Sequence, residues 1–370
     1  MRCLLPFALL PFAAFAAAQG YVSPAHFGHV EGTANNTLPF GGNTATSTPY
    51  RYQQIHDDVP TSVIQGIAFR HETTSAGTLR APFTVTVDVW MSTSPNTSAT
   101  PDAVFDNNHG VDKVQVVTNR VVSVPANDPS LVPNPFDIEI PFDPGIVFPF
   151  VGGGAALCWE VQVTARTNTA SVPFDAIQNS GSSPANPVAI SSKAFPGCVA
   201  TGRTLPMTAT PQSNSVAPMD WINGTGALGV NGTQLQSNGV VAFVYGVDRT
   251  QWNGIPLPFD VPGSTGAPSG TCTLHTEILV MNAMLTSATG TASSQLVFAV
   301  TPALHGVTIN TQILGLDAAA NPLGFTTSNM VVQQLVAPYP IPMGICRIYL
   351  GGSLGASGST GATGLVTKFL

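Results

Sequence analysis

The alternation of apolar and polar residues constrains the fold of this chain most strongly. In residues 83–91 every odd-numbered residue is apolar, whereas the even-numbered positions include Thr84, Thr86 and Asp88. Successive side chains of a β-strand point to opposite faces, so this period predicts a strand with one buried face. Residues 136–142 repeat the pattern, with Asp and Glu in the polar positions.

Further segments of this kind recur along the chain, bounded by clusters of Pro, Gly, Asn and Asp that predict turns. They are residues 62–70, 113–125 and 157–165, and then 240–247, 272–281, 295–300, 307–316, 325–336 and 345–350. No helical period of ten or more residues interrupts them. We therefore predict an all-β protein made of two antiparallel β-sandwich domains, of the jelly-roll or immunoglobulin-like kind.

The first residues have the pattern of a secretory signal peptide. Arg2 precedes an apolar run at residues 4–15, and small residues follow up to Ala18, after which we expect cleavage. A membrane anchor is the alternative, but spanning a bilayer takes about 20 apolar residues, and this run is shorter and contains Pro6 and Pro11. The sequence thus predicts a secreted, periplasmic or cell-surface protein without a membrane span in the mature chain.

The domain boundaries follow from where the strand pattern fades. Between residues 167 and 212 the chain becomes rich in Asn, Ser and Pro, and we place the boundary near Gly202. This gives a signal peptide (1–18), an N-terminal sandwich (19–202) and a C-terminal sandwich (203–350). Residues 351–370 are rich in Gly, Ser, Ala and Thr, a composition typical of a flexible tail.

Charge is scarce throughout the chain. Only 8% of the residues are Asp, Glu, Lys or Arg, against about 25% in ordinary domains. The 12 basic residues are fewer than the 19 acidic ones and do not cluster, which argues against nucleic acid as a partner. The 44% of apolar residues nevertheless suffices for a folded core, unlike the composition of disordered chains.

Four cysteines remain once Cys3 leaves with the signal peptide: Cys158, Cys198, Cys272 and Cys346. Export to an oxidising compartment favours two disulfides. A zinc site is the alternative, but no pair of cysteines has metal-ligand spacing.

The strand phase suggests how these cysteines pair. Cys272 and Cys346 each share a predicted face with apolar residues, whereas Cys158 alternates with the apolar set. We expect Cys272 to pair with Cys346 inside the second core, and Cys158 to pair with Cys198 from a covering loop.

Two clusters of polar residues are candidate sites. His56 and Asp57, together with Glu72 one strand later, provide the residue types of a metal or general-base site. The alternative is an ordinary turn before a strand, where Asp and Pro are common.

The second cluster, Asp106, Asn108 and Asp112, surrounds Gly110 and resembles a calcium loop. It lacks the glycine register and the closing Glu of an EF-hand, so a turn between strands is the simpler interpretation. No other cofactor is indicated.

Signals for catalysis are weak. The nearest match to a Gly-x-Ser-x-Gly elbow, at residues 355–358, has the wrong spacing and no strand-to-helix context. Asp88, Glu139 and Glu160 lie on predicted strands as candidates for glycoside hydrolysis, but their alternation with apolar residues predicts positions that face solvent. Tryptophans such as Trp90 could stack on sugars, although large aromatic residues more often pack in cores.

Several short motifs resemble a module of secreted, functionally uncharacterised β-rich proteins of planctomycete bacteria. The segments that carry this resemblance are residues 52–57, 67–70, 254–260, 272–274, 302–306, 317–321 and 328–329, together with Gln312. The resemblance implies a secreted β-sandwich architecture and carries over no activity.

These observations favour a non-catalytic extracytoplasmic protein that is structural, adhesive or binding. Its expected partner is a protein or polysaccharide at the cell surface. Pairing through an exposed strand edge fits the shortage of charge, because charges are what normally protect such edges. The competing hypothesis is a secreted carbohydrate-binding protein or hydrolase that uses the N-terminal domain, in which a pocket would unite His56, Asp57 or Glu72 with an aromatic wall.

Overall fold

The computed structural model describes residues 20–42, 48–73, 79–128, 131–168, 170–178, 188–194, 197–212, 220–221, 224–261, 272–338 and 343–370. The predicted signal peptide and its cleavage after Ala18 lie outside these residues. Within them, all secondary structure is β except three short 3-10 helices, η1 (Ala25–Phe27), η2 (Phe105–Asn108) and η3 (Pro302–Leu304). The strand pairings are antiparallel, which confirms the all-β prediction. No helix in the described residues is long and apolar enough to cross a membrane.

Four sheets are built from residues 21–178 and 345–369, and we call them the first sheet group. The six-stranded sheet runs in the order β26 (Ser359–Gly361), β25 (Ile345–Gly351), β3 (Tyr50–His56), β10 (Ala156–Arg166), β6 (Phe83–Ser94) and β7 (Val114–Val124). The four-stranded sheet contains β1 (Tyr21–Ser23), β28 (Thr367–Phe369), β5 (Gly66–Phe69) and β8 (Ile138–Pro141). Smaller sheets join β2 (Ala34–Asn36), β11 (Phe174–Gln178) and β27 (Thr363–Leu365), and β4 (Ser62–Ile64) with β9 (Phe148–Phe150).

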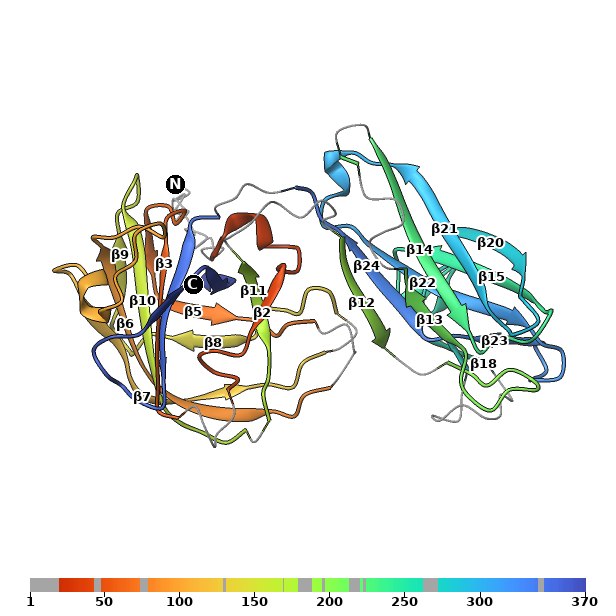
Figure 1. Ribbon diagram of the computed structural model, residues 1–370, viewed down its shortest axis with the longest axis horizontal. Coiled ribbons are helices and arrows are strands. Elements are labelled where there is room, and N and C mark those ends of the chain that lie inside the picture. Colours follow the sequence, from red (N-terminus) through yellow and green to blue (C-terminus); the bar gives the residue numbers. More distant parts are fainter. Residues whose placement is uncertain are drawn as a thin grey trace, which may run out of the picture.

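The remaining four sheets, from residues 188–335, form the second sheet group. The largest runs in the order β12 (Val188–Ala194), β24 (Met330–Leu335), β22 (Thr308–Leu316), β15 (Val240–Gly246) and β20 (Val280–Leu285), with β23 (Phe325–Thr327) also on β22. The others are β13 (Thr208–Pro211), β14 (Thr225–Thr233) and β21 (Ala292–Ala299), then β16 (Gln251–Trp252) with β17 (Ile255–Pro256), and β18 (Phe259–Val261) with β19 (Cys272–Leu274). Figure 1 shows the two groups side by side.

The C-terminal residues differ from the prediction. Strand β25 pairs with β3 in the first sheet group rather than with the second strand series. Residues 351–370, predicted to be a flexible tail, contribute β26, β27 and β28, and Leu365 and Phe369 are buried in the first core. Strand β12, placed by the sequence in the N-terminal domain, pairs with β24 of the second group. Local composition missed this because pairing with distant strands orders the Gly-rich chain.

The predicted alternation of residues 83–91 is confirmed in β6. Its odd-numbered apolar residues are buried in the main core of the first group, and Phe83, Val85 and Met91 are among them. Strand β10 behaves differently because it lies between β3 and β6 and is covered on both faces. Glu160 was expected to face solvent, and it is fully buried.

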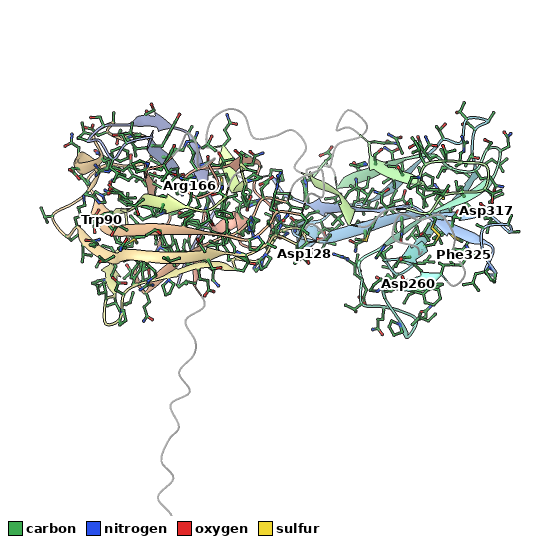
Figure 2. The ribbon with its side chains drawn as sticks, turned by 90° about the horizontal axis from the view of Figure 1, so that it is seen from below. Trp90, Asp128, Arg166, Asp260, Asp317 and Phe325 are labelled. Carbon is green, nitrogen blue, oxygen red and sulfur yellow. A yellow bond between two sulfur atoms is a disulfide. The ribbon has the colours of Figure 1, made fainter. Side chains whose placement is uncertain are left out.

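The cysteine pairing also differs. Cys198 and Cys272 form a disulfide. Phe325, which is labelled in Figure 2, packs against it. Cys158 and Cys346 are buried free thiols, so the predicted 158–198 and 272–346 bridges are wrong. Both free cysteines lie opposite Ile55, one on each side of β3. Two strand spacings separate their Cα atoms by roughly 10 Å, beyond the roughly 7 Å that a disulfide can span.

Candidate functional site

His56, the first predicted site residue, lies at the end of β3 in a buried hydrogen-bond network. Its Nδ1 is 2.6 Å from the Ser23 hydroxyl, which also bonds to the Asp58 carboxylate. Its Nε2 accepts the indole N–H of Trp159 at 2.9 Å. An indole N–H only donates, so the neutral ring carries its proton on Nδ1 and donates it to Ser23, whose own proton goes to Asp58.

This polarity decides what the network can do. In a hydrolase triad the histidine accepts the proton of the serine, whereas here His56 donates toward Ser23. Burial lowers the pKa of His56 to about 3, so the ring stays neutral at physiological pH. The arrangement fixes β1 to β3 and does not activate a nucleophile.

Asp57 points away from this network. Its carboxylate accepts the backbone N–H of Ser98 at 2.9 Å and the Ser98 hydroxyl at 2.5 Å. This is a loop contact between residues far apart in sequence, on the exposed surface. Asp57 and His56 therefore do not form one site.

The three residues of the predicted calcium loop are engaged separately. Asp112 accepts the backbone N–H of Thr93, and the Asn108 side chain donates to Gln53 at 2.9 Å. Asp106 is paired with Arg51 and Lys113. Among the described residues, Asp106 and Asp112 belong to no group of three or more His, Cys, Asp or Glu side chains that could hold a metal ion.

A buried ion pair that the sequence did not identify lies beneath η2. Both carboxylate oxygens of Glu160 accept from the Arg51 guanidinium, at 2.8 and 3.0 Å, and one also contacts His109 Nε2 at 3.1 Å. Burial alone would raise the pKa of Glu160, but the hydrogen bonds from His109 and Arg51 outweigh it and lower the pKa. Two neighbouring glutamines also donate to Glu160, so its oxygens are fully occupied.

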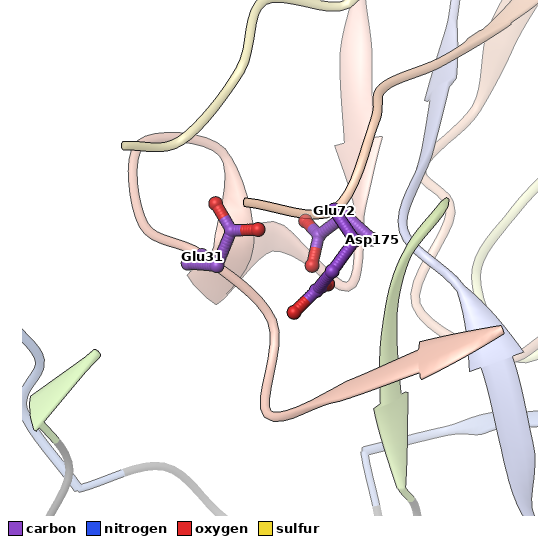
Figure 3. Close-up of side chains that lie close together, drawn as sticks. All are labelled: Glu31, Glu72 and Asp175. Atoms are coloured by element: carbon purple, nitrogen blue, oxygen red, sulfur yellow. The ribbon is translucent and has the colours of Figure 1, made fainter. Parts of the chain in front are cut away.

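The most concentrated group of carboxyls is Glu31, Glu72 and Asp175, whose ligand atoms lie within 4.8 Å of one another. Figure 3 shows the three carboxyl groups converging. Glu31 follows η1, Asp175 lies on β11, and Glu72 follows β5. Arg70 Nε donates to Asp175 at 2.6 Å, which brings one guanidinium to three acids.

The surrounding backbone donates to the same group. Glu31 accepts the backbone N–H of Thr73 at 2.7 Å, and Asp175 accepts that of Gly32 at 2.7 Å. Position 32 requires glycine because an added Cβ would collide with the carbonyl oxygen of Ala176. The loop can approach β11 this closely only without a side chain.

Electrostatics in this acidic cluster favour partial protonation. Burial, together with the charges of its neighbours, raises the pKa of Glu72 strongly, and burial likewise raises the pKa of Glu31. Carboxyls this close cannot all ionise, so one retains a proton and shares it. A hard cation such as Ca²⁺ needs six to eight oxygens, but donors from Thr73, Gly32 and Arg70 already occupy oxygens of Glu31 and Asp175. The chemistry therefore fits a shared proton better than a metal ion.

The sequence named Glu72 as part of a site but overlooked Glu31, Arg70 and Asp175. One signal was available: Asp175 stands alone among Phe174, Ala176 and Ile177, and Arg70 ends an apolar strand. Isolated opposite charges in apolar segments of a weakly charged chain indicate a buried ion pair.

The first group also has an open groove of about 890 Å³. Tyr21, Phe136, Phe369 and Lys368 contribute to its walls, and neither the acidic cluster nor His56 lines it. The groove therefore offers aromatic surface and one ammonium group, without the buried acids and the imidazole.

An exposed apolar strand marks the second sheet group. Strand β20 ends its sheet, with β15 on one side and no further strand among the described residues on the other. Met281 is 60% exposed and Leu285 is 72% exposed, and Leu279 just before the strand is 61% exposed. Residues 278–316 contain no Asp, Glu, Lys or Arg.

In comparisons with known proteins, no family model matches this chain and no curated protein is significantly similar to it. The candidate functions therefore rest on the geometry described above.

Proposed function

We propose that this is a non-catalytic extracytoplasmic protein, structural, adhesive or binding at the cell surface, and that its two sheet groups are two antiparallel sandwich domains. The chain leaves the first group after Gln178 and returns to it at Ile345. On this proposal the second domain is an insertion between strands of the first. The partner is a protein or polysaccharide at the cell surface.

The observation that carries the proposal is the unprotected edge of β20. An edge strand exposes unpaired N–H and C=O groups, and proteins usually protect it with charges or bulges. Strand β7, which ends the six-stranded sheet, has both: Arg120 lies in the strand and the register with β6 shifts. Strand β20 pairs with β15 without a shift and carries no charge. A large exposed apolar surface of this kind is typical of a binding site.

The ionisable residues support the non-catalytic part of the proposal. The most deeply buried acids that meet a base, Glu160 and Asp175, are each bonded to an arginine. A general acid or base must reach a substrate proton. These side chains instead hold loops and strands together.

The groove of about 890 Å³ favours one alternative, a carbohydrate-binding protein. Its aromatic walls offer the apolar faces on which sugars stack, and Lys368 offers a hydrogen-bond donor. The hydrolase form of this alternative is less supported, because His56, Asp57 and Glu72 belong to three separate networks.

A cell-binding experiment tests the proposal. Fluorescently labelled full-length secreted protein is incubated with cells of the producing organism, alongside a variant with Met281→Lys and Leu285→Lys. The matched control is Val121→Lys, which places a lysine on the exposed face of β7. We expect the β20 variant to lose at least about tenfold in affinity and the control to bind like the wild type. Equal binding by all three proteins would overturn the proposal, and binding to a polysaccharide array that Phe136→Ala abolishes would favour the alternative.

A further inference from the structure

Strand β20 combines an open edge with a repeated apolar face. Leu285 lies opposite Val240 of β15. Val241 of β15 pairs with Gly315 of β22, so the next residues in this antiparallel register, Val240 and Leu316, also lie opposite each other. Leu285, Val240 and Leu316 therefore form one row across the sheet. All three side chains are exposed, between 41% and 72%. Side chains alternate along a strand, so Met281 and Ala283 share this outer face with Leu285.

The strand is self-complementary when two copies run antiparallel. A two-fold axis perpendicular to the sheet leaves the outer faces of both copies on the same side of the joined sheet. Odd-numbered residues of one copy must therefore lie opposite odd-numbered residues of the other, and even-numbered opposite even-numbered. With the axis at Asn282, Leu279 of one copy faces Leu285 of the other, and Met281 faces Ala283. Every outer-face pair in this register is apolar, and each contains a side chain with substantial exposure in the single chain.

We propose that two copies of this protein pair through β20 in this antiparallel register, which extends the β12–β20 sheet across a two-fold interface. The proposal deepens the proposed function and rests on it by naming the partner of the β20 edge as a second copy of the chain. The interface is closed, because each copy contributes its single β20 edge to the other.

Charge selects this partner. A strand bearing Lys or Glu would gain no ion pair at the uncharged β20 edge and would lose hydration of its own charges. The matching chemistry is an uncharged, apolar strand, and every copy of the chain supplies one. The chain has a net charge of −7, but residues 278–316 contain no Asp, Glu, Lys or Arg. The pairing strands of two copies therefore carry no like charges that would repel each other.

The first test measures the mass of the full secreted chain by sedimentation equilibrium over a wide concentration range. We expect a monomer–dimer equilibrium that Leu285→Lys weakens at least about tenfold, whereas Val121→Lys leaves it unchanged. A monomer at every concentration would overturn the proposal. Species that grow beyond the dimer would overturn it too, because they indicate pairing of β20 with a different edge such as β21.

A cysteine pair tests the register. Asn282→Cys places the two introduced thiols directly opposite each other, with Cβ atoms roughly 5 Å apart, and oxidation should link the dimer. Leu285→Cys is the matched control, since its two copies lie roughly 20 Å apart in this register. Linkage of the control but not of Asn282→Cys would contradict the two-fold at Asn282.

Charge rescue separates specific pairing from a general loss of apolar surface. In the proposed register, Leu279→Glu added to Leu285→Lys sets the new carboxylate opposite the new ammonium of the other copy. The double variant should recover the dimer that the single variant loses. No recovery would show that residues 279 and 285 do not meet.

The outcome of this test is distinguishable from that of the cell-binding test. Cell binding that depends on β20 in a protein that stays monomeric would leave the proposed function standing and reject self-pairing. A dimer without any cell binding would reject the proposed function and leave self-pairing through β20 standing.

Discussion

The two sheet groups bury polar side chains of different kinds. The first group encloses charges: Arg51 with Glu160, and Arg70 with Asp175, form ion pairs whose acids are fully buried. The second group relies on neutral amides such as Gln312, which donates to the carbonyls of Thr273 and Ser328 at 2.7 Å and accepts the N–H of His275. Both halves thus bury hydrogen-bonded amides, whereas the ion pairs with fully buried acids described here lie in the first group.

This difference predicts that the stabilities of the two groups respond to different solution conditions. Most groups with large pKa changes, such as His56, Glu31 and Glu72, belong to the first group, and in the second group burial lowers the pKa of His275 to about 4. The second group contains the disulfide between Cys198 and Cys272. We therefore expect pH to act mainly on the first group and reductants mainly on the second.

The largest expected effect comes from breaking a buried ion pair in the first group. Arg70→Met leaves Asp175 and Glu31 without their compensating charge and frees the carbonyls of Phe27 and Val30. We expect the free energy of unfolding at pH 7 to fall by about 3–5 kcal/mol, measured by urea denaturation. Lys113→Met is the control, because its ion pair with Asp106 is exposed and contributes less than about 1 kcal/mol. Equal effects of the two substitutions would show that burial does not decide how much an ion pair of the first group stabilises the fold.

Removing the disulfide should have the next largest effect, confined to the second group. The bridge joins residues 74 positions apart, and substituting both cysteines by alanine should cost about 2–4 kcal/mol. Trp252 lies in the second group and Trp159 in the first, so fluorescence of chains that retain one tryptophan reports each group separately. Addition of a reductant to the wild-type chain should reproduce the change at Trp252. An equal change at Trp159 would contradict the division.

Acidification should weaken the first group through His56. Its pKa is about 3 when folded and about 6.5 when unfolded, so the unfolded state binds more protons as the pH falls below 6.5. The contribution of neutral His56 to the free energy of unfolding is fully present above pH 6.5, and the free energy of unfolding should decrease by about 2 kcal/mol by pH 5. His56→Gln should remove this decrease, with Trp159 fluorescence as the readout because the indole bonds to His56. A wild-type chain and a variant with the same pH dependence would refute the assignment.

The smallest effect is expected from Glu72→Gln. Burial raises the pKa of Glu72, so its contribution to stability is present at low pH and is lost as the pH rises through the folded pKa. An amide replaces the neutral acid with nearly the same shape, and the change at pH 5 should stay below about 0.5 kcal/mol. At alkaline pH the variant should be more stable than the wild-type chain. A large loss at pH 5 would show that Glu72 is ionised there and pairs with Arg70.

The sequence predicted local structure better than long-range pairing. The alternation in residues 83–91 was sufficient to place β6 and its buried face. The same reasoning failed for Glu160, because alternation does not reveal that η2 covers the second face of β10. A polar side chain on a central strand is exposed or buried according to a segment elsewhere in the chain.

The cysteines and the candidate site illustrate the same limit. Cys158 and Cys346 both lie opposite Ile55, a relation that depends on three strands far apart in sequence. The acidic cluster likewise collects residues from the N-terminal loop, from the end of β5 and from β11. The residue types were visible in the sequence, but their convergence depends on the sheet order.

The return of the chain to the first group has a consequence for the order in which the two groups fold during synthesis. The strands of the second group are all contained in residues 188–335, so this part can fold before the last residues emerge. Until residues 345–351 arrive, β3 of the first group has an open edge with the buried His56 network beside it. A chaperone that protects strand edges would therefore act on the half of the protein that is synthesised first.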